Sequence, residues 1–334
     1  MLKKLSAVFS ATLFILLFIV PCLFADQKLK VVATIFPLYD FAREVGGNRI
    51  DVSMLLPPGV EAHTFEPRAQ DIVRLNKADV FIYTGQFMEP WVADLLQGVT
   101  SNSLLVVDAS VGITLMDEAE HEAEHEAEHE AEHEAEHEVE HAIEHETEHE
   151  TEHEHHHGGK DPHIWLDFVL AQNMVDTIAR SFVQKDPVNS AYYMANAENY
   201  KERLKDMDAR YAATLSTCQI RTIIYAGHFA FGYFARRYSL QHVSPYKGFS
   251  PDAEPAPKSI KEIIDTIKAV GSSTIFYEEL IDPKVARMIA GETGARLELL
   301  HGAHNVAKDK MTDLSYLKIM EDNLPKLKEG LRCQ

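Results

Sequence analysis

Short apolar runs alternate with helical patterns along this chain of 334 residues, and this alternation constrains the fold more than any other feature. In the first half, strands are expected at 29–35, 51–56, 80–84 and 104–108, with helices at 37–45 and 69–78. Strands that alternate with helices along a chain build parallel sheets that the helices cover. The first half therefore predicts an α/β fold.

The second half repeats this pattern after a long helical stretch. Apolar residues recur at steps of three and four from Tyr193 to Leu215, and a shorter helix is expected before them at 168–183. Strands are then expected at 222–225, 273–277 and 297–300, with helices at 229–238, 258–270, 283–293 and 313–331. The expected fold class is α/β, with two similar lobes, each a mainly parallel sheet flanked by helices, joined by a long spine helix. The lobes are placed at 26–160 and 218–334, and the spine helices at 161–217.

The N-terminus has the pattern of a secretory signal peptide. Two lysines precede an apolar run at 7–20, and Ala25 stands before a polar start. The run is shorter than the roughly 20 residues that a membrane-spanning helix needs, which favours removal over anchoring. We expect cleavage after residue 25 and a periplasmic or other extracytoplasmic location. Lipid attachment at Cys22 is the less favoured alternative, because Pro21 fits a lipoprotein signal poorly.

Two cysteines remain after the expected cleavage, Cys218 and Cys333. Two cysteines in an exported chain are typical of one disulfide, because exported proteins reside in an oxidising compartment. We therefore expect a bond that ties the end of the spine to the C-terminus. Two free buried thiols are the alternative.

The net charge of −20 is concentrated in one place. Residues 117–157 hold nineteen of the 52 acidic residues and no lysine or arginine, which leaves 33 acids against 32 bases elsewhere. Outside this tract the sequence has no basic excess of the kind that nucleic-acid-binding proteins show, so we expect no nucleic-acid partner.

The same tract is a histidine–glutamate repeat in which histidine recurs at every fourth residue. Its histidines are His121, His125, His129, His133, His137, His141, His145, His149, His153, His155, His156 and His157. In a helix this spacing would align the first nine on one face, but the glutamates repeat at the same interval without positive partners and oppose a helix. We expect a disordered insertion, and its composition indicates low-affinity metal binding. A tolerated, solvated repeat is the alternative, and whether transport needs the tract is left open.

Six histidines lie outside the tract, and most of them follow predicted strands. His63 and His228 each follow a strand, His301 and His304 follow another, and His163 lies at the entry to the spine. In open α/β sheets, ligands bind beyond the carboxyl ends of the strands. We therefore expect histidines from both lobes to meet in one cleft.

Such a set of side chains suits a borderline metal ion. Neutral imidazole binds Zn²⁺ well, and three or four such ligands complete a tetrahedral shell. Any one histidine alone would more often be an ordinary hydrogen-bonded residue, which is how we interpret His242. Glu61, Asp161 and Asp167 lie near the histidines in sequence, and could orient the rings or bind the ion themselves.

Several motifs that contain these histidines resemble the zinc/manganese solute-binding proteins of ABC importers. The specific ones are Asp-Pro-His-Ile-Trp-Leu-Asp at 161–167 and Gly-His-Phe-Ala-Phe-Gly-Tyr-Phe at 227–234, whereas Glu-Ala-His-Thr-Phe-Glu-Pro at 61–67 and Ser-Pro-Asp-Ala-Glu-Pro at 250–255 add less. The similarity covers essentially the whole chain after the signal, and the His-rich insertion stands where zinc members often carry one. Family members have two lobes on a long rigid helix, so the resemblance implies small closing motions.

The resemblance implies metal ligands at His63, His163 and His228. Manganese members tend to replace the third of these by a carboxylate, so His228 points to zinc rather than manganese. Many relatives have an acid as the fourth ligand; His304 stands at that place here, and His301 competes with it. The resemblance also implies delivery of the ion to a membrane permease and its ATPase, and we expect the carrier to be a monomer.

Three classes of function remain, and a binding protein is favoured over an enzyme or an adhesin. A closed shell of histidines leaves no coordination position for an attacking water, which suits carriage rather than catalysis. A zinc-dependent hydrolase would need an open position and a general base such as Glu61 or Asp161. A metal-dependent adhesin could use the same fold, and the sequence discriminates poorly between it and a carrier.

Overall fold

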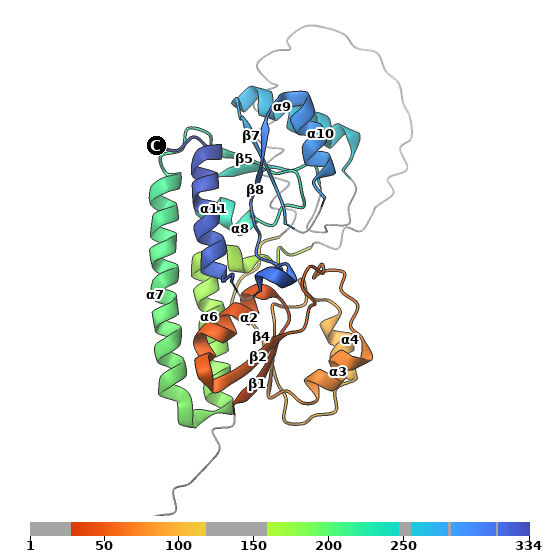
Figure 1. Ribbon diagram of the computed structural model, residues 1–334, viewed down its shortest axis with the longest axis vertical. Helices are drawn as coiled ribbons and strands as arrows, with labels where there is room; N and C mark the ends of the chain where they lie inside the picture. Colours follow the sequence, from red (N-terminus) through yellow and green to blue (C-terminus); the bar gives the residue numbers. More distant parts are fainter. Residues whose placement is uncertain (1–27, 118–158, 247–254, 280–281, 312) are drawn as a thin grey trace, which may run out of the picture.

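The computed structural model describes residues 28–117, 159–246, 255–279, 282–311 and 313–334, and the structural statements below refer to these residues. They form two α/β lobes beside a group of long helices (Figure 1). The expected signal peptide, all tract histidines and most of the motif at 250–255 lie outside the described residues. Within the described part, no helix is long and apolar enough to cross a membrane.

The first lobe is built on a four-stranded parallel sheet in the order β2-β1-β3-β4. Its elements are β1 (Leu29–Ala33), α2 (Phe36–Gly46), β2 (Ile50–Met54), α3 (Ala69–Leu75), β3 (Val80–Tyr83), α4 (Val92–Gln97) and β4 (Leu105–Asp108). Successive residues of β1 face opposite sides of the sheet. Val31 and Ala33 pack with α2 and the long helices, whereas Val32 packs with α3 and α4. Both faces of the sheet are therefore buried, as is usual for parallel sheets.

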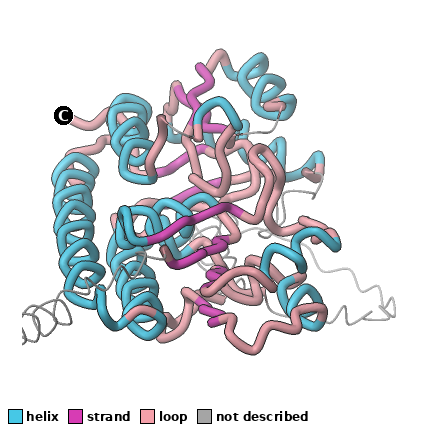
Figure 2. The backbone as a smooth tube through the Cα atoms, turned by 60° about the horizontal axis from the view of Figure 1, so that its bottom comes forward, coloured by secondary structure: helices cyan, strands magenta, loops and turns pink. Residues whose placement is uncertain are grey.

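The second lobe contains two parallel strand pairs, β5-β6 and β7-β8, linked by a parallel bridge between Tyr225 and Phe276. Its elements are β5 (Thr222–Ile224), α8 (Gly232–Arg237), β6 (Gln241–Val243), α9 (Pro257–Val270), β7 (Thr274–Tyr277), α10 (Lys284–Thr293) and β8 (Arg296–Leu299). Ile263 of α9 and Ile289 of α10 bury one face of these strands. Figure 2 shows helices on both sides of the strands. The predicted pair of parallel α/β lobes is confirmed.

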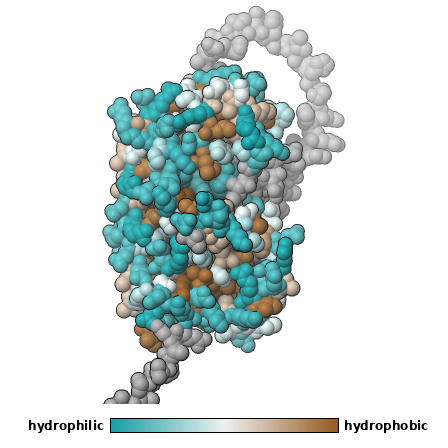
Figure 3. Space-filling view, viewed as in Figure 1, coloured by the Kyte–Doolittle hydropathy of each residue, from teal (hydrophilic) through white to brown (hydrophobic). Residues whose placement is uncertain are grey.

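Three long helices lie along one side of both lobes (Figure 1): α6 (Phe168–Lys185), α7 (Ser190–Leu215) and α11 (Tyr316–Gly330). Asp167 caps α6, because its carboxylate accepts hydrogen bonds from two N–H groups of the first turn. α7 buries the seven residues that the spacing from Tyr193 to Leu215 predicted, which confirms the spine helix. On the face drawn in Figure 3, hydrophilic residues predominate and apolar residues lie between them in separate groups.

One hydrophobic core runs through both lobes and the spine. It includes Val31 of β1, Tyr200 of α7 and Phe276 of β7. The expected disulfide between Cys218 and Cys333 is present and joins the end of α7 to the C-terminus. Movement of one lobe against the other would therefore disturb a shared, close-packed interior.

Two expectations about local structure need correction. The helix expected at 229–238 begins only at Gly232, because Phe229 and Phe231 turn inward and pack on the ring of Tyr225. The short elements α4 and β6 were not predicted, since three to six residues give too little periodicity to distinguish helix or strand from loop.

Candidate metal centre

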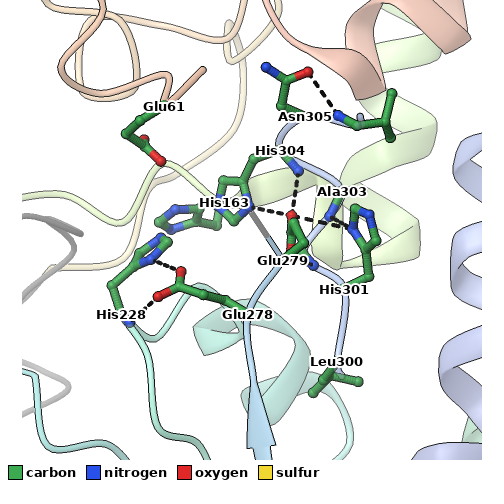
Figure 4. Close-up of polar contacts among 12 residues, drawn as sticks. Glu61, His163, His228, Glu278, Glu279, Leu300, His301, Ala303, His304 and Asn305 are labelled. Atoms are coloured by element: carbon green, nitrogen blue, oxygen red, sulfur yellow. Dashed lines mark hydrogen bonds and ion pairs between the residues drawn. The ribbon is translucent and has the colours of Figure 1, made fainter. Parts of the chain in front are cut away.

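Four histidines from four separate segments come together between the two lobes. His63 lies in the loop after β2, His163 precedes α6, His228 follows β5 and His304 follows β8. Figure 4 shows the last three with the acidic residues that surround them. Segments that follow strands of both lobes supply His63, His228 and His304, as predicted, and His163 joins them from the segment before α6.

The donor nitrogens of His63, His163 and His228 all lie within 4.8 Å of one another. The Nε2 atoms of His63 and His163 are 3.4 Å apart. A tetrahedral zinc ion with Zn–N bonds of about 2.0–2.1 Å separates its ligand atoms by roughly 3.3–3.4 Å. The spacing of this pair is therefore that of two ligands on one tetrahedral ion.

His304 stands in the same group of rings, although its donor atoms are not within the 4.8 Å set. Its ring centroid lies 5.0 Å from that of His163 and 5.2 Å from that of His228. These separations are shorter than the 5.4–6.1 Å between the rings of the other three. His304 Nε2 and His228 Nε2 are buried and have no hydrogen-bond partner among the described residues. Buried polar atoms are rarely left without a partner, so an ion bound at this place would account for both.

Asp161 sets the orientation of His163, which is fully buried. Asp161 Oδ1 lies 2.8 Å from His163 Nδ1 and also accepts a hydrogen bond from the His163 backbone N–H at 2.9 Å. A carboxylate on Nδ1 holds the proton there and leaves the lone pair of Nε2 for a metal ion. Burial, followed by the neighbouring histidines, holds the pKa of His163 well below 6.5. The ring is therefore neutral at physiological pH, which is the state that binds metal.

Glu278 holds His228 in the same way. One carboxylate oxygen is hydrogen-bonded to His228 Nδ1, and the other accepts from the His228 backbone N–H at 3.3 Å. Burial lowers the pKa of His228, but the hydrogen bond to Glu278 and the charges of Glu278, Glu61 and Glu279 together raise it by more, so the net shift is upward. Gly227 permits this approach, because a Cβ there would lie 2.6 Å from the Glu278 carboxylate.

Glu279 supports the segment that contains His301 and His304. Its Oε1 lies 3.2 Å from His304 Nδ1 and 3.3 Å from His301 Nδ1, and its Oε2 accepts a hydrogen bond from Gly302 N–H at 2.8 Å. Burial raises the pKa of Glu279, but the two histidines lower it by more, so the carboxylate stays ionised. Figure 4 shows Glu278 directed toward His228 and Glu279 toward the other two histidines.

His63 is the most exposed of the four and is half-buried. Its loop is attached to the first lobe by Trp91, whose Nε1 donates to the carbonyl of Ala62 at 2.9 Å. Burial, followed by the charges of His228 and His304, lowers the pKa of His63 to about 3. This ring is also neutral near pH 7.

His301 and His242 have other contacts. His301 Nδ1 accepts a hydrogen bond from Ala303 N–H at 3.0 Å, and its ring lies on the far side of Glu279 from His228 (Figure 4). This placement favours His304 over His301 as the fourth donor. His242 stacks on Phe229 with ring centroids 3.6 Å apart, in agreement with its interpretation as an ordinary residue.

Sequence reasoning missed Glu278 and Glu279. Both directly follow β7, so the rule that located the histidines, that ligands gather at carboxyl ends of strands, also applied to them.

Of the three carboxylates that sequence reasoning named instead, only Asp161 orients a ring. Glu61 accepts a hydrogen bond from the backbone N–H of His63 at 2.9 Å, which is a contact with the loop backbone rather than with the ring. Asp167 caps α6, and its carboxylate forms an ion pair with Arg237 at 3.5 Å.

Residues 31–330 match the protein family described as zinc-uptake complex component A, periplasmic (ZnuA). The high-affinity zinc uptake system protein ZnuA of Bacillus subtilis is 36% identical over 306 residues, which are 91% of this chain and 88% of that protein. The zinc-binding protein AdcA of Streptococcus pyogenes serotype M18 is 34% identical over 305 residues. That match covers 91% of this chain but 56% of AdcA, so the chain spans just over half the length of this relative.

Solved structures agree with this relationship. The metal-dependent lipoprotein YcdH of Bacillus subtilis superposes with a TM-score of 0.71 at 33% identity, over 91% of this chain and 99% of that one. The Zn(II)-bound ZnuA-like domain of AdcA from Streptococcus pneumoniae gives the same TM-score and coverage at 27% identity. The family match extends over almost the whole chain and includes all four histidines of the centre. This chain therefore belongs to the family of periplasmic zinc-uptake component A proteins.

Proposed function

We propose that this protein is the extracytoplasmic solute-binding protein of an ABC importer, which captures Zn²⁺ between its lobes and delivers it to the membrane permease and its ATPase. The observation that carries this proposal is the convergence of four histidines, three of which have Nδ1 beside a carboxylate. The Bacillus subtilis relative named for high-affinity zinc uptake and the Zn(II)-bound related domain support it.

The proposed ligands are the Nε2 atoms of His63, His163, His228 and His304. Four imidazole nitrogens suit Zn²⁺, whereas Mn²⁺ prefers oxygen ligands. Because four protein ligands complete a tetrahedral shell, no position remains for a reactive water. This arrangement supports carriage of the ion and argues against hydrolysis.

The N-terminus and the His/Glu tract serve the same carrier function in this proposal. Residues 1–25 direct export and are removed, with lipid attachment at Cys22 as the alternative. The carrier works as a monomer. Its lobes are at 26–160 and 218–334, and the spine that joins them is at 161–217. The His/Glu tract binds further ions with lower affinity.

The tract leaves the first lobe and returns to it at one place. Asp117 and Lys160 form an antiparallel bridge and an ion pair, and Asp161 N–H donates to Met116 O at 3.0 Å. Tyr233 joins the two sides, since its hydroxyl accepts from Met116 N–H and donates to Asp161 O. Residues 118–158 can therefore be removed without pulling apart the segments that hold His163.

Zinc content after purification without added metal tests the proposal. We compare the protein lacking 118–158 with the same protein in which His63, His163 and His228 are replaced by alanine, after dialysis against a weak chelator. The first should retain one zinc ion per chain and the second none, while His242→Ala serves as the control and should retain one. One retained ion in the triple variant would refute the site.

A further inference from the structure

The segment 301–306 leaves the second lobe after β8 and crosses to the first. Its start is held by α11, where Asn323 bonds both the N–H of His301 at 3.1 Å and its carbonyl at 2.9 Å. Glu279 accepts from the N–H groups of Gly302 and His304. The backbone that carries His304 is therefore fixed to the second lobe.

The middle of the segment is held by the spine and the first lobe. Trp165 Nε1 donates to the carbonyl of Gly302 at 2.8 Å, and the N–H of Phe36, the first residue of α2, donates to the carbonyl of His304 at 3.2 Å. The same short segment is thus bonded to both lobes within three residues.

Asn305 completes the connection with its side chain. Its Nδ2 donates to the carbonyls of Pro57 at 2.8 Å and Val60 at 2.9 Å, and its Oδ1 accepts from the N–H of Val306 at 2.8 Å. The residue is 1% exposed, so water does not compete for these bonds. All hydrogen-bonding atoms of this amide are matched, with both donors used on the loop of the other lobe.

Two ligand-bearing segments meet at this amide. Asn305 follows His304 directly, and Val60 precedes His63 by three residues on the loop between β2 and α3. That loop has no helix or strand between Leu55 and Arg68, so its position depends on individual bonds of this kind.

We propose that Asn305 is a positioning residue that holds the His63 loop against the His304 segment and thereby sets the rate at which the bound ion is released. This inference rests on the proposed zinc-binding function. His63 is half-buried and lies on an irregular loop, so it is the ligand that can withdraw without disturbing the core. With the amide in place, His63 and His304 keep a fixed separation, and the shell opens only when the bonds to Pro57 and Val60 break.

Tryptophan fluorescence follows this site in the full chain. Trp165 lies 5.4 Å from the ring of His163 and 5.3 Å from that of His304, and Trp91 is bonded to the residue before His63. The chain has two tryptophans, and neither belongs to the His/Glu tract. Fluorescence therefore reports on the four-histidine site while the tract remains in place.

The test compares zinc release from wild type, Asn305→Ala and Asn305→Asp, by mixing the zinc-loaded protein with excess EDTA in a stopped-flow instrument. Asn305→Asp keeps the size of the side chain and the bond to Val306 N–H, but removes the donor and places carboxylate oxygens against two carbonyls. Both variants should release zinc about tenfold faster, as expected from the loss of two buried hydrogen bonds. Amide hydrogen exchange in 57–68 of the zinc-free protein should also become faster. The control is Asn196→Ala, which removes a similar amide bond to Val45 O at 3.0 Å, between α7 and α2; its release rate should match wild type.

The outcomes separate the two proposals. If wild type shows no saturable fluorescence change with zinc, the proposed function fails. If wild type binds zinc and both Asn305 variants fold, yet release it within about twofold of the wild-type rate, the positioning role of Asn305 is wrong. Should Asn305→Ala be unfolded, Asn305→Asp and the hydrogen-exchange measurement decide the question.

Discussion

Glu278 and Glu279 are neighbours in the chain, but their carboxylates hold different histidines of the metal centre. Glu278 is hydrogen-bonded to Nδ1 of His228, and Glu279 lies 3.2 Å from Nδ1 of His304. One dipeptide directly after β7 therefore orients two ligands of the centre. Carboxylates that orient metal-binding histidines fix the tautomer and make the ring a stronger donor.

We predict that Glu278→Gln and Glu279→Gln each weaken zinc binding by about 10–100-fold. Glutamine can still accept from Nδ1–H, but it lacks the charge that makes the histidine more basic. Competition with a fluorescent zinc chelator, in the protein lacking 118–158, measures the affinity. Glu292→Gln, an exposed change on α10, is the matched control and should leave it unchanged. Unaltered affinity in both carboxylate variants would show that they do not tune the site.

The choice of fourth ligand gives a second prediction. His304→Ala should lower zinc affinity by about 100-fold, because it removes a donor whose Nε2 is buried without a partner among the described residues. His301→Ala should change it by less than about threefold, since its Nδ1 is engaged with Ala303 N–H. The same competition titration checks both variants, and the reverse order of effects would assign the fourth place to His301.

A third prediction concerns the contact between α7 and α8. Asp208 accepts hydrogen bonds from Arg237 Nε at 2.6 Å and from the Tyr238 hydroxyl at 2.7 Å. Asp208→Ala removes the acceptor for both groups, and should lower the free energy of unfolding by about 2 kcal/mol. Urea unfolding of the zinc-free protein measures this change. The exposed replacement Asp265→Ala on α9 should cost much less, and equal losses in the two variants would contradict the argument.

Glu89 provides a prediction on pH. The residue is buried, and it accepts hydrogen bonds from the Thr34 hydroxyl at 2.5 Å and the N–H groups of Thr84 and Gly85 at 3.0 and 3.2 Å. Burial raises its pKa from 4.5 to about 7 despite these bonds. Between these two values the native protein keeps a proton that the unfolded chain has lost. The free energy of unfolding should therefore fall as pH rises through this window, by about 3 kcal/mol in total, and stay level above pH 7 as far as Glu89 is concerned.

Glu89→Gln removes this dependence, because the amide carries no charge at any pH. Its oxygen can accept from the two backbone N–H groups while its amino group donates to Thr34. The stability of the variant relative to wild type should increase from pH 4.5 to about 7 and then remain constant. Chemical unfolding of both zinc-free proteins at intervals over pH 4.5–8 tests this, and parallel curves would show that Glu89 titrates near its ordinary value.

The sequence predicted those parts of the fold that rest on local periodicity. The spacing from Tyr193 to Leu215 identified the spine helix and its buried side. Strand ends located His63, His228 and His304, whereas His163 was placed by its position at the entry to the spine. The carboxyl ends of parallel strands lie at the same edge of a sheet. The positions of these histidines in the sequence were therefore enough to predict that they meet.

Contacts between distant side chains could not be predicted in this way. Asn305 bonds the carbonyl of Pro57 across 248 residues, and Glu278 reaches His228 across 50. No periodicity links such pairs. The first contact depends on how the two lobes pack, and the second depends on how β5 and β7 lie side by side within the second lobe. The inward turn at Phe229 has the same origin, since packing on Tyr225 overrides the helical tendency of the segment.

Zinc K-edge X-ray absorption of the protein lacking 118–158, loaded with one equivalent of Zn²⁺, identifies the ligands that hold the ion. A shell of His63, His163, His228 and His304 predicts four nitrogen scatterers at about 2.0–2.1 Å with the outer-shell pattern of imidazole. In His304→Ala one imidazole should disappear from that pattern. In the protein with all four histidines, a spectrum with two or fewer imidazoles, or with five or six oxygen-rich ligands, would contradict a four-histidine shell.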